Sequence, residues 1–196
     1  MMSSRLGYVA TGALILLMWS SSARGRCLEG TSVATYQTGG PYQGFYLYTI
    51  DLSFDLEQGL SNVTLKLDFD DCPELACYQL FAFPRPAGQM SGQIASCPVA
   101  FIGAFNCGGN PSIDLVGPVV KWDADNSSGC EPGKTGNITL FFYSNLGPNP
   151  DKQTPLFLIK NGQEVCEGTL DGDIPASPCL IPTQEMKWGA IKSIYQ

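Results

Sequence analysis

The stretch Asn62-Val63-Thr64-Leu65-Lys66-Leu67-Asp68-Phe69-Asp70 alternates apolar and polar residues without interruption. Successive side chains of a β-strand point to opposite faces of the sheet, so this pattern predicts a strand with one buried and one solvated face. Residues 44–56 alternate in the same way but less regularly, and residues 57–61 separate the two strands as a hairpin loop. The rest of the chain must then supply strands that cover the apolar face of this hairpin.

Further strand candidates follow at intervals of roughly 8–15 residues, separated by turns rich in Gly and Pro. No segment has sustained helical periodicity, and Asn161-Gly162 favours a type I′ hairpin turn. We predict a disulfide-stapled antiparallel β-sandwich of immunoglobulin-like or jelly-roll-like type with seven or eight strands. An up-and-down barrel is less favoured because long irregular loops break the even spacing. The strand candidates are residues 78–83, 99–105, 112–122, 137–143, 155–160, 163–170 and 188–195, whereas residues 24–43 and 88–97 are expected to be irregular.

The first residues have the composition of a secretory signal peptide. Arg5 precedes the apolar run Leu6–Trp19, which as a helix reaches only about 21 Å, short of a bilayer core of roughly 30 Å. Small residues follow, so we expect cleavage after a leader of residues 1–23 and one β-sandwich domain over residues 24–196. The mature protein is expected to be secreted, without membrane insertion.

The chain is acidic overall. It has 11 Lys and Arg against 18 Asp and Glu, a net charge of −7, and loss of Arg5 with the leader gives 10 against 18, or −8. Such a protein lacks the positive surface that binds phosphate backbones or anionic lipids. We therefore expect no nucleic-acid partner.

Eight cysteines follow the leader, an even number that in an exported chain predicts four disulfide bonds. Zinc is the alternative, but the chain has no histidine and no Cys-x2-Cys pair. The pairing is open, with two local bridges as our hypotheses, Cys72 with Cys77 and Cys97 with Cys107. The eight residues are Cys27, Cys72, Cys77, Cys97, Cys107, Cys130, Cys166 and Cys179.

Three Asn-x-Ser/Thr sequences, at Asn62, Asn126 and Asn137, are candidate N-glycosylation sites. Asn62 and Asn137 fall on the polar phase of alternating strands, and Asn126 lies in a polar loop. We therefore expect all three side chains to be exposed, as a glycan requires.

Carboxylates cluster in three places, and the cluster of Asp123 and Asp125 is the calcium candidate because its loop begins like an EF-hand loop. The other two clusters are Asp68, Asp70 and Asp71, and Asp171 and Asp173. Oxygen-rich loops hold calcium, but the loop of Asp123 and Asp125 lacks the glycine and the final glutamate of an EF-hand loop. A solvated acidic turn is the favoured interpretation, so we expect no metal and no cofactor.

The absence of histidine excludes Ser-His-Asp and Cys-His catalytic arrangements. A glycoside hydrolase needs only two carboxylates and stays as a third alternative. Phe141, Tyr143 and Trp122 are candidate ligand contacts, because a rigid aromatic face suits a sugar ring.

We expect a non-enzyme, a structural or adhesive protein of the cell surface, extracellular matrix or an extracellular filament. It would contact other extracellular proteins or itself through strand edges or its C-terminal tail. The alternative is a lectin-like, carbohydrate-binding module that uses exposed aromatic residues, with glycans as partners.

Overall fold

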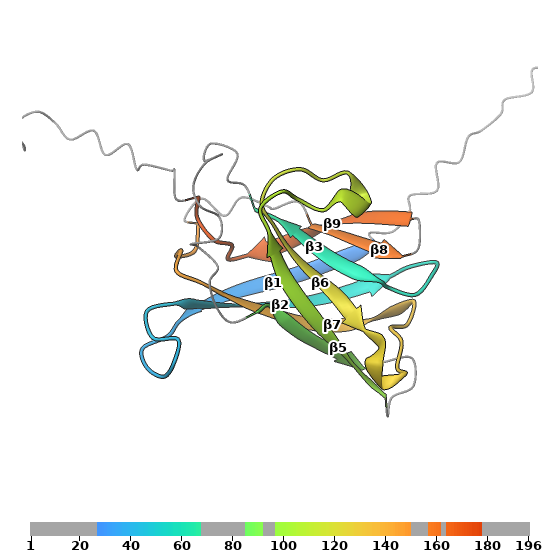
Figure 1. The fold of residues 1–196 in the computed structure, drawn as a ribbon, viewed down its shortest axis with the longest axis horizontal. Helices are drawn as coiled ribbons and strands as arrows, with labels where there is room; N and C mark the ends of the chain where they lie inside the picture. The colour runs from blue at the N-terminus through green and yellow to red at the C-terminus, as the bar shows by residue number, and fades with distance from the viewer. Residues whose placement is uncertain (1–26, 68–84, 92–96, 150–156, 162–163, 178–196) are drawn as a thin grey trace, which may run out of the picture.

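A computed structural model describes residues 27–67, 85–91, 97–149, 157–161 and 164–177 of the chain (Figure 1). These parts contain nine β-strands and two single-turn 3-10 helices, and no α-helix. The strands are β1 (Leu28–Tyr36), β2 (Tyr46–Asp55), β3 (Asn62–Lys66), β4 (Ala87–Ser91), β5 (Pro98–Asn106), β6 (Val119–Asp125), β7 (Thr135–Ser144), β8 (Phe157–Asn161) and β9 (Glu164–Gly172), and the 3-10 helices are η1 (Pro111–Ile113) and η2 (Asn126–Ser128).

The all-β class predicted from the sequence is confirmed, but a sandwich of two sheets is not what the structure shows. The strands form a single closed barrel in the order β1-β2-β7-β4-β5-β6-β3-β8-β9, and β9 pairs in parallel with β1. The other pairs are antiparallel, so the sheet is mixed. The contact between the first and last described strands closes the ring, and local sequence patterns carry no signal for such a distant pairing.

Several strand predictions are confirmed. In β2, Tyr48, Ile50, Leu52 and Phe54 are buried and the residues between them face outward. The hairpin predicted around Asn161 is also found, with Asn161 opposite Glu164 in the β8–β9 ladder. The strands predicted at residues 78–83 and 188–195 lie outside the described residues.

Two segments predicted as irregular form strands, β1 and β4. Both contain glycine and polar residues, which weaken a strand signal. Gly30 in β1 and Gly168 in β9 allow close packing at the closure, because a Cβ at Gly30 would overlap Leu52 and one at Gly168 would overlap Leu28. The glycines thus let large neighbours fill the barrel interior where β1 and β9 meet.

The prediction that one face of β3 is exposed to solvent is wrong. Asn62 and Thr64 are buried, although they lie on the polar phase of the pattern. The segment that joins β5 to β6 packs beside β3, and Asn110 Nδ2 donates a 2.9 Å hydrogen bond to Thr64 Oγ1. Asn110 also caps η1, accepting from the Ser112 backbone N–H at 3.2 Å. A connection from another part of the chain therefore covers a face that alternation alone assigns to water.

Two disulfide bonds are described, Cys27–Cys166 and Cys97–Cys130, with Cα–Cα distances of 6.3 and 5.7 Å. The expected Cys97–Cys107 bridge is wrong, because these cysteines flank opposite ends of β5. A nine-residue strand is about 30 Å long, far beyond the reach of a disulfide. Cys107 is itself disulfide-bonded, and the expected Cys72–Cys77 bridge lies outside the described residues.

Candidate functional site

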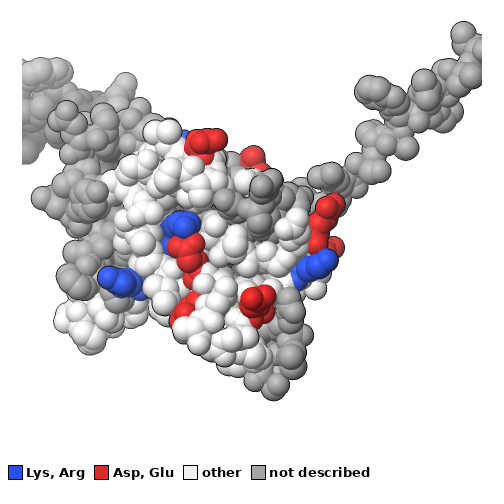
Figure 2. Space-filling model, turned by 45° about the vertical axis from the view of Figure 1, so that its right-hand side comes forward, with Lys and Arg blue, Asp and Glu red and all other residues white. Residues whose placement is uncertain are grey.

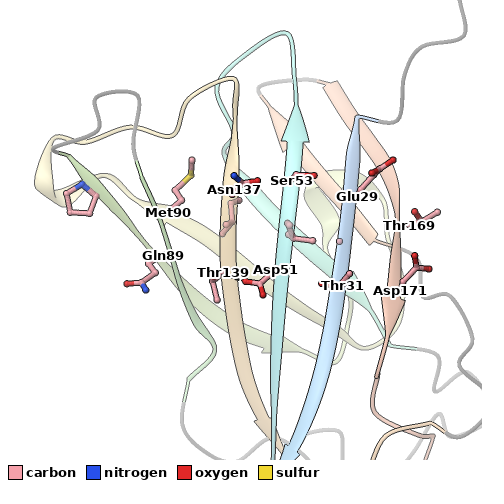
Figure 3. A pocket seen from close by; sticks show the side chains of 14 residues that line it. Glu29, Thr31, Asp51, Ser53, Gln89, Met90, Asn137, Thr139, Thr169 and Asp171 are labelled. Atoms are coloured by element: carbon pink, nitrogen blue, oxygen red, sulfur yellow. Dashed lines mark hydrogen bonds between the residues drawn. The ribbon is translucent and has the colours of Figure 1, made fainter.

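An open groove of about 760 Å³ crosses the outer face of the barrel, opposite to the core (Figure 3). Residues from β4, β7, β2, β1 and β9, which are consecutive neighbours in the sheet, line it together with Pro98 at the start of β5. Leucine and isoleucine side chains on the alternate positions of these strands fill the core, which leaves their polar partners to form the floor.

The strand register aligns polar side chains into two rows across the groove. In the first polar row each residue is paired with the next along the sheet, and Figure 3 shows these side chains side by side. It consists of Gln89, Thr139, Asp51, Thr31 and Asp171. The second polar row lies two residues away along the same strands and consists of Asn137, Ser53, Glu29 and Thr169.

The charge of the two polar rows is entirely negative. Glu29, Asp51 and Asp171 are exposed carboxylates, and the described residues that line the groove include no Lys or Arg. Thr139 Oγ1 donates a 2.7 Å hydrogen bond to Oδ1 of Asp51, which fixes the carboxylate in the row. Hydroxyl, amide and carboxylate groups together offer both donors and acceptors to a ligand.

Two further rows, each of two apolar residues and one threonine, continue the same outer face beyond the first polar row. Phe141 lies opposite Thr49, which lies opposite Val33, and Tyr143, Leu47 and Thr35 follow in the next row. Val33 is 59% exposed, and the ring of Tyr42 packs on Tyr143 with centroids 4.4 Å apart. A surface with polar rows beside half-exposed aromatic rings therefore spans β7, β2 and β1.

The structure places two of the three predicted aromatic contacts on this surface and excludes the third. Phe141 and Tyr143 are partly exposed on the outer face. Trp122 has no exposed surface and packs against Phe142 in the core, so it cannot contact a ligand from outside. The alternation of β6 explains the error, because Trp122 shares the inward phase with Val120.

The candidate glycosylation residues have three different environments. Asn137 is exposed at the end of the second polar row, and Asn126 is exposed in η2. Asn62 is only 6% exposed, and its Oδ1 has no hydrogen-bond partner within the described part of the chain. The expected exposure of Asn62 is therefore wrong, because β3 is flanked by β6 and β8 and its outer face is covered.

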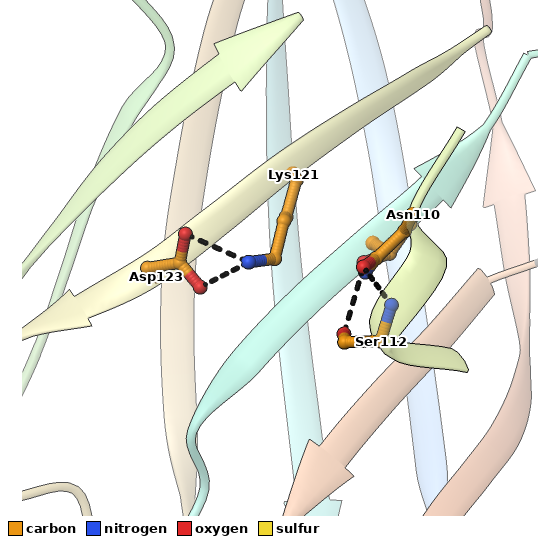
Figure 4. A network of polar contacts seen from close by, with 5 residues as sticks. Asn110, Ser112, Lys121 and Asp123 are labelled. Carbon is orange, nitrogen blue, oxygen red and sulfur yellow. Dashed lines mark hydrogen bonds and ion pairs between the residues drawn. The ribbon is translucent and has the colours of Figure 1, made fainter. Parts of the chain in front are cut away.

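The two calcium candidates have local partners. Asp123 forms an ion pair with Lys121, with Nζ–Oδ1 and Nζ–Oδ2 distances of 2.7 and 3.0 Å (Figure 4). Asp125 caps η2 by accepting a 2.9 Å hydrogen bond from the Ser127 backbone N–H, which lowers the pKa of its carboxyl. Within the described ranges, no group of three or more His, Cys, Asp or Glu residues is placed to hold a metal ion.

In Figure 2, the basic side chains lie at separate positions and do not gather into a patch. The helices in the described part of the chain all lack the length and hydropathy that a membrane span requires.

The sequence predicted the outward orientation of several residues that line the groove, but it did not predict that these residues form a groove. Asp51, Ser53, Asn137 and Thr139 lie on the polar phases of predicted strands, and this alternation was the available signal. Thr31, in a segment predicted as irregular, was missed, and Asp171 was noted only as part of a carboxylate pair with Asp173 in a predicted loop. Comparison of the chain with models of protein families, with curated protein sequences and with solved structures finds no match.

Proposed function

We propose that this protein is an exported, non-catalytic adhesive module that binds polysaccharide through the outer face of β7, β2 and β1. The observation that carries the proposal is the pair of polar rows in a groove beside half-exposed aromatic residues. Sugar rings present hydroxyl groups at their edges and C–H groups on their faces. A site for them therefore needs hydrogen-bonding groups and an apolar surface side by side.

The rigidity of the surface supports binding of an extended ligand. All residues of the polar rows lie on strands of one closed sheet, and the Thr139–Asp51 hydrogen bond links β7 to β2. Side chains held on strands lose little freedom when they bind a ligand, which lowers the entropic cost of association.

The environment of the carboxylates supports a binding role over hydrolysis. A glycoside hydrolase needs one carboxyl group that stays protonated near neutral pH, which burial in apolar surroundings provides. Glu29, Asp51 and Asp171 are all exposed in an open groove.

Adhesion through this face is also favoured over association through strand edges, because each described strand pairs with two neighbours in the barrel.

A binding assay on insoluble polysaccharides with two arginine variants tests the proposal. Thr31→Arg places a long side chain between Asp51 and Asp171 in the first polar row, whereas Gln58→Arg adds the same side chain to an exposed loop residue outside the groove. We expect the wild type and Gln58→Arg to sediment with at least one polysaccharide, and Thr31→Arg to lose at least about tenfold in affinity.

Two results would overturn the proposal. One is that no polysaccharide in a broad panel retains the wild type. The other is that Thr31→Arg, with an unchanged thermal midpoint, binds as well as Gln58→Arg. Release of reducing sugar ends from a bound polymer would contradict the non-catalytic part alone.

A further inference from the structure

We infer that the groove is selective for polysaccharides with protonated amino groups, of the class of β-1,4-linked glucosamine polymers. This inference rests on the proposed function and specifies its ligand. It starts from the charge of the two polar rows, in which three carboxylates face the groove, and among the residues that the structure describes no basic side chain lines it. An anionic polysaccharide would be repelled there, and a cationic one attracted.

The spacing of the Asp51 and Asp171 carboxylates supplies a second argument, which does not depend on the net charge of the groove. Asp51 and Asp171 are both register partners of Thr31, from opposite sides of β1. They therefore lie two strands apart in the first polar row, at a backbone separation of about 10 Å. Thr31 lies between them with its hydroxyl available for a hydrogen bond.

In an extended β-1,4-linked glucosamine chain, the distance at which amino groups recur along one edge matches the separation of Asp51 and Asp171. Consecutive sugars in such a chain are turned by half a rotation, so amino groups on the same edge recur at every second sugar. The length of two sugars is close to the separation of the Asp51 and Asp171 strands. A glucosamine polymer that lies along the first polar row thus presents one amine to each carboxylate and a hydroxyl to Thr31.

The remaining residues of the surface suit the rest of the same ligand. Gln89 and Thr139 extend the first polar row beyond Asp51, and Glu29 in the second row adds negative charge along one side. On the other side, Phe141 follows Thr139 on the same face of β7. It offers an apolar surface to the C–H face of a sugar.

Titration calorimetry with short soluble oligomers tests the inference in low-salt, slightly acidic buffer. The ligands are glucosamine oligomers, N-acetylglucosamine oligomers of the same length, and oligolysine as a cation without sugar. The variants are Asp51→Asn, Asp171→Asn and the double variant. Glu57→Gln is the matched control, because it removes an exposed carboxylate outside the groove.

We expect glucosamine oligomers to bind more tightly than the acetylated oligomers and oligolysine, and salt to weaken their binding. Each single groove variant should lose about two- to fivefold in affinity for glucosamine oligomers, and the double variant about tenfold. Glu57→Gln should bind as the wild type does. The acetylated oligomers, which carry no charge, should respond less to all three groove variants.

The outcomes separate this inference from the proposed function. Equal affinity for acetylated and free-amine oligomers, lost in Thr31→Arg, would overturn the amine selectivity and leave polysaccharide binding intact. Equal binding of oligolysine, or equal losses in Asp51→Asn and Glu57→Gln, would show attraction to net negative charge and overturn the inference. Failure of both glucosamine and N-acetylglucosamine oligomers to bind would overturn this inference, whereas the proposed function is overturned only if the panel of polysaccharides also fails to retain the wild type.

Discussion

Thr139 on β7 donates a 2.7 Å hydrogen bond from its Oγ1 to Oδ1 of Asp51 on β2. The two residues are register partners at the centre of the first polar row. The bond joins a hydroxyl from a candidate glycosylation sequence, Asn137-Ile138-Thr139, to a carboxylate that we propose as a ligand contact. The glycosylation that we predict at Asn137 and the ligand binding that we propose at Asp51 thus involve neighbouring groups in one groove.

Variants of Thr139 and Asn137 separate the effect of the glycosylation sequence from the effect of the hydrogen bond to Asp51. Thr139→Val removes both the hydrogen bond and the sequon, Thr139→Ser keeps both, and Asn137→Gln removes the sequon while it keeps an amide at that position of the second polar row. Because the bond is partly exposed, we expect Thr139→Val to lower the free energy of unfolding by less than about 1 kcal/mol. Its affinity for glucosamine oligomers should fall about twofold, since Asp51 is no longer oriented. Calorimetry that shows the same loss in Asn137→Gln would contradict this explanation.

The two described disulfide bonds should differ in their contribution to stability. Cys27–Cys166 encloses 139 residues and Cys97–Cys130 encloses 33. Chain-entropy arithmetic gives a loss of about 5 kcal/mol for the double serine variant of the first pair and about 4 kcal/mol for the second. Denaturant unfolding measures both values. Non-reducing peptide mapping checks the pairing itself, and a Cys97–Cys107 peptide from native protein would contradict the structure.

The three sequons should differ in occupancy when the protein is secreted from a eukaryotic cell. Asn126 and Asn137 are exposed and can carry a glycan, whereas Asn62 is 6% exposed between β6 and β8. A glycan on Asn62 is incompatible with this packing. We expect glycopeptide mass spectrometry of folded, secreted protein to find Asn126 and Asn137 modified and Asn62 unmodified. A folded fraction that carries a glycan at Asn62 would refute this prediction.

The stability of the barrel should fall at high pH because of Tyr48. Burial raises the pKa of its phenol well above the usual value, and the Asp173 carboxylate and Tyr46 raise it further. The folded state thus retains a proton that the unfolded state loses above about pH 10. The free energy of unfolding should be unaffected by this group below about pH 9, and should decrease as the pH rises beyond 10.

Two phenylalanine variants isolate this effect in urea unfolding at increasing pH. Tyr48→Phe removes the titrating group, and also its 2.9 Å hydrogen bond to the Leu146 carbonyl, at a cost of about 1 kcal/mol near neutral pH. Its stability should then depend less on pH above 10. Tyr36→Phe changes a tyrosine that is 53% exposed and should keep the wild-type slope. Parallel slopes for all three proteins would show that Tyr48 is not the cause.

Prediction from the sequence succeeded where a property depends on neighbours along the chain. The alternation of residues 46–55 predicts which side chains of β2 are buried, and Asn161 marks the β8–β9 hairpin. It failed at β3, where the alternation of Asn62, Val63 and Thr64 predicts a solvated face. A distant segment with Asn110 covers that face, and no local pattern reports such a contact.

The sequence by itself determined the all-β class, because the period of two that separates core from surface is a local property of the strand. Only the tertiary structure decided that the sheet closes, that Cys97 pairs with Cys130, and that Asp51, Thr31 and Asp171 align in one row. These features depend on register between strands far apart in the chain. A shift of one residue in that register turns every side chain of a strand to the opposite face, so the groove exists only in the assembled barrel.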